Sequence, residues 1–442
     1  MPESGTYGSV RGAPSNGRPY RDCLLGVGYR LSYSGIAFHT ILSYSRSVPT
    51  DDLLYQYNPW WEGDFALQGI KPRPAQLARM HSLLSPKRVL FLSGLRRVGK
   101  TTLLRLLVRE LIEGGAEPSS ILYISLDDYL LRQESIVEVV SAYRKLHRLS
   151  VDKPVFLLFD EITYKEDFQQ QLKNLIDRER VTIVATSSSS SLLRDQRAFL
   201  TGRSALLEIQ PLSFPEYLEF KGIHVPKRDQ QLLDSYFRDY IREGGLPEHV
   251  LQPERDYLMS LIDDIIQKDI TAFRGLKDHQ ILRDYFTLLM ERSGKQASIN
   301  KLSNILKISP DTSRRYLGYF EETYLVHLVQ RWGKTNERIL SPKKVYACDL
   351  AVKHLFIGER DFGSYFENYV YLRLRRHQGV YYVLTDGIEL DFLTEDDTLI
   401  ESKYNSHLEG KQLAAFQAHA ARRKEVIDSV PALSVIDELW EA

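Results

Sequence analysis

The rest of this chain is organised around residues 89 to 106, which read Val-Leu-Phe-Leu-Ser-Gly-Leu-Arg-Arg-Val-Gly-Lys-Thr-Thr-Leu-Leu-Arg-Leu. It begins with an apolar run, makes a tight loop bounded by Gly94 and Gly99, and passes through Lys100 and Thr101 into a helical pattern. The loop reads Gly-x-x-x-x-Gly-Lys-Thr, and a strand before it with a helix after it is the context of a P-loop. The stretch therefore predicts a strand–loop–helix unit that binds a polyphosphate.

The chemistry of this loop follows from its residue types. Gly94 and Gly99 allow backbone conformations that turn successive N–H groups toward a polyphosphate, and the helix that follows points its positive end at the same anion. Lys100 adds a charge near the β- and γ-phosphates, and the Thr101 hydroxyl is suited to ligate Mg²⁺. The Arg96 and Arg97 side chains are expected to point outward. We expect ATP and Mg²⁺ to be bound by Gly94, Leu95, Arg96, Arg97, Val98, Gly99, Lys100, Thr101 and Thr102.

The composition limits the kind of protein. The 442 residues are enough for two or three domains, and the formal net charge of zero gives no global attraction to nucleic acid. The two cysteines, Cys23 and Cys348, lie far apart in the sequence, which argues against a disulfide scaffold and fits a reducing compartment. Because no apolar run is long enough to span a membrane and no signal peptide is evident, we expect a cytoplasmic protein without a membrane contact.

A second apolar run, Val155 to Phe159, ends in Asp160 and Glu161. Such a run is typical of a buried parallel strand, and α/β sheets bind their ligands at the carboxyl ends of such strands. Asp160 is placed to hold the water shell of Mg²⁺, and Glu161 is placed to polarise the attacking water. A further run, Val181 to Thr186, leads into serines that include Ser188. A hydroxyl there either senses the γ-phosphate or only caps the next helix, and both interpretations stay open.

Strands that alternate with helices predict an α/β fold with a mostly parallel sheet, as in P-loop NTPases. Beyond this core, the pattern becomes helical and then mixed. The expected order is a poorly ordered extension (1–57), the P-loop core (58–212), a helical lid (213–278), a winged-helix-like segment (279–342) and a C-terminal α/β domain (343–442).

Two short helices around a turn give the winged-helix-like segment its helix–turn–helix spacing. The second helix carries Arg314 and Arg315, which are expected to face outward. DNA binding by this helix is one interpretation; a module that only packs against its neighbours is the other, because the surroundings carry little excess positive charge. The expected elements are helix 299–306, helix 312–319 and a wing strand within 324–331.

Charged residues gather on two predicted strands of the C-terminal domain. In a strand, Glu401 and Lys403 share a face, and Asp391 joins them across a hairpin. Two carboxylates suit a divalent metal, so Asp391 and Glu401 are candidate metal ligands, and Glu367 on the preceding helix is a candidate fourth member of the group. A surface hairpin that carries these charges by chance is the alternative. The expected strands are 388–394, 398–404 and a last short one near Leu433.

With these residues in view, the chain after Asn58 resembles the prokaryotic AAA-type ATPases that carry a C-terminal restriction-endonuclease-like domain. Gly94 to Thr101 resembles the Walker A motif, and Asp160 with Glu161 resembles Walker B. The serines around Ser188 resemble sensor 1. The resemblance implies Mg²⁺-dependent ATP hydrolysis.

Two further segments carry the resemblance between the core and the lid. Thr201-Gly202-Arg203 is similar to the family's Gly-Arg segment, in which Arg203 would act as an arginine finger. Gly245-Leu246-Pro247 is similar to a Gly-x-Pro element of related ATPases, and this similarity implies that Pro247 packs on the nucleotide.

The C-terminal charges resemble the PD-(D/E)xK set of nucleases. The matching residues are Glu367, Asp391, Glu401 and Lys403. Leu390 stands where the motif has proline, which puts cleavage of nucleic acid in question.

The expected function is that of an ATP-hydrolysing regulatory protein whose nucleotide state is coupled to the winged-helix and C-terminal domains. Two alternatives stay open. One is a non-catalytic nucleotide switch with a DNA- or protein-binding platform, and the other is an ATP-controlled, metal-dependent nuclease. ATP is the expected ligand; DNA, a protein or a second copy of the chain are candidate partners.

Overall fold

The computed structural model describes the chain in the ranges 50–63, 65, 67, 69–189, 200, 202–226, 229–272, 274–276, 279–376 and 379–436. Residues 1–47 and 48–442 form separate units, and the described residues belong to the second. The expected poorly ordered extension lies outside the described residues up to residue 49, but its last part is a helix. α1 (Thr50–Tyr57) buries Leu53 and Leu54 in the core, so the folded unit begins before Asn58.

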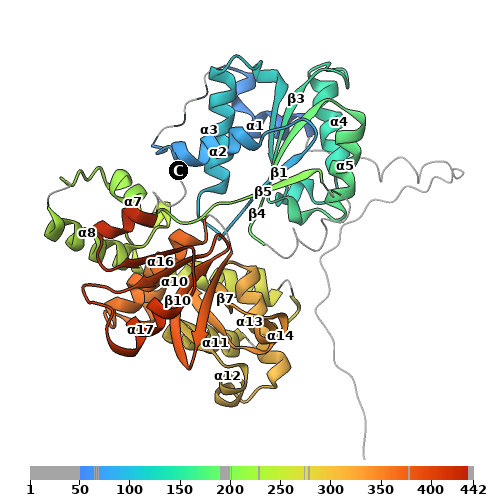
Figure 1. The fold of residues 1–442 in the computed structure, drawn as a ribbon. Coiled ribbons are helices and arrows are strands. Elements are labelled where there is room, and N and C mark those ends of the chain that lie inside the picture. Colours follow the sequence, from blue (N-terminus) through green and yellow to red (C-terminus); the bar gives the residue numbers. More distant parts are fainter. Residues whose placement is uncertain are drawn as a thin grey trace, which may run out of the picture. The chain divides into compact units, whose positions relative to one another are not determined.

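A five-stranded parallel sheet forms the centre of the P-loop core (Figure 1). Its strands are β1 (Val89–Ser93), β2 (Ile121–Ser125), β3 (Val155–Asp160), β4 (Val181–Ser187) and β5 (Ser204–Glu208), in the spatial order β2-β3-β4-β1-β5. The apolar runs of the sequence form these strands because helices cover the sheet on both faces. The expected α/β fold with a parallel sheet is thereby confirmed, and the P-loop lies at the carboxyl end of β1.

The helices of this core are α2 (Pro74–Leu83), α3 (Lys100–Glu113), α4 (Ile136–Leu146) and α5 (Phe168–Arg178), with short turns η1 (Pro59–Trp61), η2 (Pro118–Ser120), η3 (Tyr129–Leu131) and η4 (Ile162–Tyr164). Alternate side chains of β1 point to opposite faces of the sheet. Leu90 and Leu92 pack with residues of α2 and α3, whereas Val89 and Phe91 pack with residues of α4 and α5. This double burial fixes β1 and so the position of the loop that follows it.

A helical segment follows β5. It consists of α7 (Phe214–Lys221), α8 (Gln230–Glu243), α9 (Pro247–Leu251), α10 (Arg255–Asp264) and the π-helix η6 (Ile265–Ala272). The turn between α8 and α9 requires glycine at two positions. Gly244 has a φ of 71°, and a Cβ atom on Gly245 would lie 2.3 Å from the carbonyl oxygen of Leu212.

A second, mixed sheet contains seven strands in the order β12-β11-β10-β9-β7-β8-β6 (Figure 1). Its strands are β6 (Lys295–Ala297), β7 (Val326–Arg331), β8 (Lys343–Ala347), β9 (Val380–Thr385), β10 (Ile388–Thr394), β11 (Thr398–Ser402) and β12 (Arg423–Ile427). Its helices are α11 (His279–Glu291), α12 (Ile299–Leu306), α13 (Pro310–Glu322), α14 (Thr335–Leu340), α15 (Leu350–Ile357), α16 (Phe362–Leu374) and α17 (Gly410–Ala418).

The seven-stranded sheet contains strands from both the expected winged-helix-like segment (279–342) and the expected C-terminal domain (343–442). β7 pairs antiparallel with β8 and parallel with β9, so the expected wing strand is an interior strand of the large sheet. The expected last strand near Leu433 is wrong. Leu433 lies in a short turn, η7 (Pro431–Leu433), because Pro431 has no N–H for a strand ladder, and the last strand is β12, which pairs parallel with β11.

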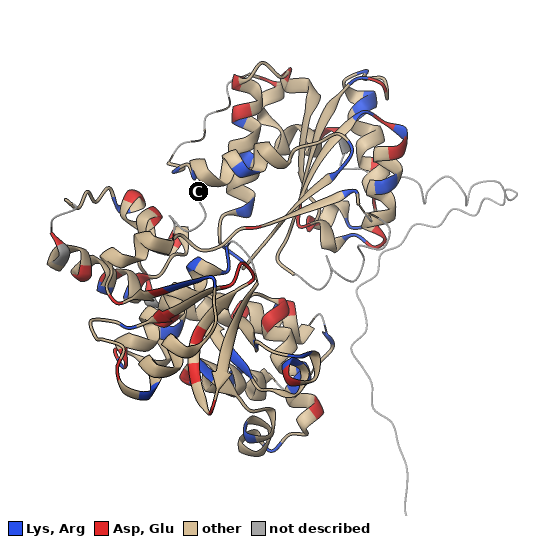
Figure 2. Cartoon of the chain, viewed as in Figure 1, with Lys and Arg blue, Asp and Glu red and all other residues tan. Residues whose placement is uncertain are grey.

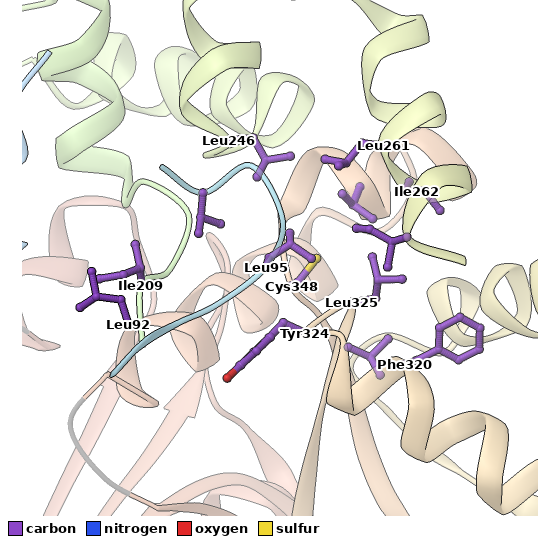
Figure 3. Packing of buried hydrophobic residues seen from close by; sticks show 14 of the residues in the cluster. Leu92, Leu95, Ile209, Leu246, Leu261, Ile262, Phe320, Tyr324, Leu325 and Cys348 are labelled. Carbon is purple, nitrogen blue, oxygen red and sulfur yellow. The ribbon is translucent and has the colours of Figure 1, made fainter. Parts of the chain in front are cut away.

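One apolar cluster runs from the P-loop into the segments beyond it. Leu95 of the P-loop belongs to the same buried cluster as Leu246, Leu325 and Cys348 (Figure 3). Basic and acidic residues are interspersed over the described elements (Figure 2), as the net charge of zero suggests. In the described part of the chain, no helix combines the length and apolar character needed to cross a membrane.

Candidate nucleotide-binding site

Two glycines shape the P-loop. Gly94 has a φ of 144°, and a Cβ atom there would lie 2.2 Å from the carbonyl oxygen of Ile209. Gly99 precedes α3 with a φ of 95°, which L-residues rarely adopt. The loop therefore needs glycine at both positions, and it leads directly into the N-terminus of α3, the kind of position at which proteins bind anions.

Lys100 lies at the first position of α3 and is buried, with 5% of its surface exposed. Its Nζ donates hydrogen bonds to the carbonyl oxygens of Gly94 at 2.9 Å and Leu95 at 3.0 Å. Burial lowers the pKa of Lys100, while the charges of Glu161 and Asp160 raise it. Among the described residues, the hydrogen bonds of this buried ammonium go to two carbonyls of its own loop, which fits an anion-binding position.

Thr101 and Asp160 meet as the sequence predicts for a magnesium position. The Thr101 hydroxyl donates to Asp160 Oδ2 at 2.6 Å, and Tyr123 OH donates to the same oxygen at 3.1 Å. The Thr186 hydroxyl donates to the other carboxylate oxygen. A hydroxyl beside a carboxylate is the donor set that suits hydrated Mg²⁺. Tyr123 and Thr186 were missed by the sequence analysis, because only the pairing of β2, β3 and β4 brings them to Asp160.

Glu161 follows β3 in the left-handed backbone region, with a φ of 49°. Its N–H donates to the Thr186 hydroxyl at 2.9 Å, and Ser188 Oγ donates to Glu161 Oε2 at 3.3 Å. Burial raises the pKa of Glu161, and the charges of Lys100 and Arg96 oppose this effect. A carboxylate with a raised pKa at a strained backbone position is typical of a functional acid or base. The helix that Ser188 was alternatively expected to cap lies outside the described residues.

A cavity of about 280 Å³ adjoins the P-loop. Thr102 lines it from the start of α3, as expected of a ligand-binding residue, and Pro247 lines it from α9. Pro247 Cγ lies 3.9 Å from the position that a Cβ atom on Gly99 would take. No local pattern in the sequence marks the other residues that line the cavity, so they could not be predicted. They are Gly69, Ile70, Lys71, Arg73, Leu103, Leu106, Phe220, Glu248 and Leu251.

Arg73 connects the P-loop to the helical segment. Its guanidinium is buried and donates to the carbonyl oxygens of Val98 at 3.4 Å and Gln210 at 3.0 Å, and to Glu216 Oε1 at 3.0 Å. Arg376, which follows α16, contacts Glu216 from the other side at 3.5 Å. Although burial raises the pKa of Glu216, the two arginines lower it to about 2. A charged Glu216 therefore joins the nucleotide site to the C-terminal sheet.

Both P-loop arginines were expected to point outward, but only one of the two does. Arg97 does, with 57% of its side chain exposed and an ion pair to Glu248 at 3.2 Å. Arg96 does not: its side chain is 25% exposed, and Nη2 lies 2.8 Å from Asp269 Oδ1 in η6. The fold brings η6 into contact with the P-loop through the Arg96–Asp269 pair, and no local pattern in the sequence predicts this contact.

Arg203 lies near the amino ends of the parallel strands, whereas the P-loop lies at the carboxyl end of β1. It precedes β5, and its carbonyl oxygen accepts a hydrogen bond from Val89 N, at the amino end of β1, at 2.9 Å. Its exposed guanidinium pairs with Asp177. Since β1 separates it from the P-loop by about 3.3 Å per residue, Arg203 does not serve the nucleotide site of its own chain. Thr201 of the same motif lies outside the described residues.

The predicted C-terminal charges are partly brought together. Asp391 Oδ2 accepts hydrogen bonds from the backbone N–H and the hydroxyl of Ser402, each at 3.0 Å. Glu401 Oε2 accepts from Asp391 N at 3.1 Å, and Lys403 Nζ lies 3.0 Å from Glu401 Oε1. Burial and the nearby charge of Asp391 raise the pKa of Glu401 to about 7.

Lys344 of β8, which sequence reasoning missed, occupies the space beside these acids. Only 1% of its side chain is exposed, and Nζ lies 2.8 Å from Glu367 and from Glu389, and 3.7 Å from Asp391. Among the described residues, no group of three or more His, Cys, Asp or Glu side chains is arranged to hold a metal ion. Glu367, the candidate fourth member of the group, is paired with the ammonium of Lys344. The only sequence signal for this pairing was a lysine, Lys344, within a short strand that otherwise carries mostly apolar residues. The metal site expected at Asp391 and Glu401 stays a prediction.

The chain matches two protein families. Residues 86–218 match the family described as an AAA domain, and residues 234–362 match a domain of unknown function (DUF8612). The chain therefore carries an AAA-type domain, which contains the P-loop and both acids at the end of β3. The second match runs from α8 to the start of α16, across β6, β7 and β8.

Similar proteins occur in distant organisms. An uncharacterized protein of Methanocaldococcus jannaschii is 28% identical over 352 residues, which cover 74% of this chain and 77% of the relative. An uncharacterized protein of Haemophilus influenzae is 27% identical over 315 residues, which cover 68% of this chain and 78% of the relative.

Solved structures of AAA-type proteins show a weaker likeness. AMPPCP-bound DnaA from Aquifex aeolicus is 18% identical with a TM-score of 0.25, over 56% of this chain and 85% of that one. The Hsp104–ADP complex of S. cerevisiae is 16% identical with a TM-score of 0.30, over 58% and 39%. Scores this low carry no argument, so the fold rests on the strand order and contacts described above.

Proposed function

We propose that the chain binds and hydrolyses ATP with Mg²⁺ at its AAA-type domain, and that the nucleotide state acts on the seven-stranded sheet. The observation that carries this proposal is the convergence of the P-loop lysine and threonine on the two acids at the end of β3. A loop that only turned the chain from strand to helix would gain nothing from a buried cation beside two acids, because burying charge is costly.

Each group has its own expected action. Lys100 would exchange its carbonyl partners for phosphate oxygens, and Thr101 with Asp160 would hold hydrated Mg²⁺, which would supply positive charge beside the phosphates. Glu161, whose raised pKa makes it a better proton acceptor, takes the proton of the attacking water. Ser188 holds the Glu161 carboxylate by its hydrogen bond at 3.3 Å.

Two contacts support coupling between this site and the rest of the chain. Pro247 follows the glycine turn and lines the nucleotide cavity, while the N–H of Gly245 donates to buried Asp349 at 2.6 Å. Arg375 pairs with Glu208 at the end of β5 through two bonds, of 2.6 and 3.0 Å. A shift of the turn at Gly245 would therefore move the start of α15, and a shift of β5 would move the end of α16.

Phosphate release by the purified chain at saturating ATP and Mg²⁺ tests the proposal. The parent is expected to turn ATP over, and Lys100→Ala is expected to lose most ATP affinity, because it removes the cation aimed at the β- and γ-phosphates. Undiminished ATP binding by this variant would contradict the P-loop assignment. ATP binding by the parent without turnover would instead favour the nucleotide switch. The same assay with added DNA tests whether DNA is the partner.

A metal-dependent nuclease is the second candidate, since Asp391, Glu401 and Lys403 are joined by hydrogen bonds and an ion pair. Lys344 argues against it, because its ammonium already supplies positive charge to the neighbouring acids. Cleavage of DNA that requires Mg²⁺ or Mn²⁺ and is lost in Asp391→Asn would establish this activity. No cleavage by the parent would leave the domain a binding platform.

A further inference from the structure

Arg96 combines burial, an ion pair and an unused hydrogen-bond donor at the nucleotide site. Nη2 is paired with Asp269 at 2.8 Å, yet Nε is buried and has no hydrogen-bond partner in the described part of the chain. A buried donor without an acceptor costs free energy, and a bound anion that accepts from it would remove that cost. The free donor lies on a P-loop residue two positions after Gly94.

The surroundings of Arg96 connect it to the proposed chemistry. Burial lowers the pKa of Arg96, but the charges of Asp269 and then Glu161 raise it above its ordinary value. Arg96 in turn acts on the pKa of both Lys100 and Glu161. The guanidinium therefore belongs to the same charge cluster as the phosphate-binding lysine and the candidate base.

Asp269 is a weak competitor for this guanidinium. Burial raises the pKa of Asp269, so its charged form depends on the nearby arginine. Its element, η6, has π-helical hydrogen bonding, which is less favourable than α-helical bonding and is common at functional sites. A phosphate carries more negative charge than a carboxylate and offers several oxygens to the planar guanidinium fork.

The other arginines near the site do not provide this contact. Arg97 is exposed and paired with Glu248, and Arg203 lies at the far edge of the sheet. Arg73 also has a buried nitrogen, Nη2, without a hydrogen bond among the described residues, but this nitrogen lies 2.9 Å from Glu216 Oε1 in an ion pair, and Nη1 donates to two carbonyl oxygens.

We propose that Arg96 binds the terminal phosphate of the bound triphosphate and leaves Asp269, so that the triphosphate state loosens η6 from the P-loop. This proposal rests on nucleotide binding at the P-loop and names the arginine that distinguishes triphosphate from diphosphate. Arg96 would then stabilise, from within the same chain, the negative charge that develops during hydrolysis.

The test measures the affinities of the full chain for ADP and for a non-hydrolysable ATP analogue. Arg96→Ala is expected to reduce the preference for the triphosphate about tenfold or more, because it removes a charge-assisted contact to the last phosphate. Arg283→Ala is the matched control, since Arg283 makes a comparable ion pair with Asp263 at 3.4 Å and contacts no P-loop residue. It is expected to leave the preference unchanged.

Two further variants guard against misfolding and indirect effects. Arg96→Lys, which keeps the charge but not the fork, is expected to show an intermediate loss with the parent's melting temperature. Asp269→Asn is expected to raise affinity for the ATP analogue, because it removes the competing carboxylate. Parent-like preference in Arg96→Ala, or an Asp269→Asn affinity as low as that of Arg96→Ala, would overturn the inference. If the parent binds neither nucleotide, the proposed function itself fails.

Discussion

At the residue scale, Glu401 shows how burial and a neighbouring carboxylate change the protonation of an acid in the C-terminal sheet. The residue is fully buried on β11 and faces Asp391, whose N–H it accepts at 3.1 Å. Burial and the neighbouring carboxylate raise the pKa of Glu401 from its ordinary value of 4.5 to about 7. The folded state therefore holds the proton of Glu401 more tightly than the unfolded state does, and neutral Glu401 is the stabilising form.

Glu401→Gln should make the chain more stable at high pH than at low pH, relative to the parent. The stabilisation from neutral Glu401 is fully present below pH 4.5 and is lost as the pH rises through about 7. Glutamine stays neutral, so the variant should gain about 1 to 3 kcal/mol above pH 7 and show little difference below pH 4.5. Urea unfolding at several pH values measures this. A difference that does not change with pH would contradict the assigned pKa.

At the element scale, the glycine turn between α8 and α9 is held by the N-terminus of α15. Asp349 caps α15 by accepting from Ala351 N at 2.8 Å and Val352 N at 3.3 Å, and it also accepts from Gly245 N at 2.6 Å. The carboxylate is 1% exposed, so all of these bonds are shielded from water. The Asp349 side chain thus caps the start of α15 and also fixes the turn that places Pro247 beside the cavity.

Asp349→Ala should destabilise the chain by about 2 to 5 kcal/mol, because it leaves several buried N–H groups without an acceptor. Asp361→Ala is the matched control: Asp361 also caps a helix, α16, but is exposed, so its loss should cost only about 1 kcal/mol. Thermal unfolding of both variants measures the contrast. Equal losses would mean that the bond to Gly245 adds nothing to an ordinary helix cap.

The elements show what the sequence can and cannot predict. Runs such as Val155 to Phe159 predict strands because burial on both faces leaves a continuous apolar signal. The P-loop and the acids at the end of β3 were predictable because adjacent residues carry their chemistry. The Arg96–Asp269 pair joins residues far apart in the chain, so only the fold reveals it. The same holds for Lys344 among the C-terminal acids.

At the scale of the whole molecule, Arg96 and Arg203 lie at opposite ends of the strands of the parallel sheet. Arg96 lies at the carboxyl edge with the P-loop, whereas Arg203 precedes β5 at the amino edge. An exposed arginine at that edge can reach a nucleotide only in another copy of the chain. If Arg203 is an arginine finger, as the sequence predicts, it therefore acts on a nucleotide bound to another copy of the chain.

Arg203→Ala should reduce ATP turnover per chain at protein concentrations where copies associate, and leave it unchanged where the chain is monomeric. Turnover measured across a dilution series, alongside the oligomeric state in solution, tests this. An arginine finger supplied by a partner is typically worth a factor of about 10³ or more. Reduced turnover by the monomeric variant would contradict action between copies, and parent-like turnover in an assembly would remove Arg203 from the mechanism.

One paired measurement tests both ATP binding by this chain and the use of Glu161 to hydrolyse it. Bound ATP and released phosphate are measured in the same samples of the parent and of Glu161→Gln. The amide cannot accept the proton of water, so the variant should bind ATP as the parent does and release phosphate at least about 10²-fold more slowly. Phosphate release at the parent rate by Glu161→Gln would show that Glu161 is not the residue that activates the attacking water.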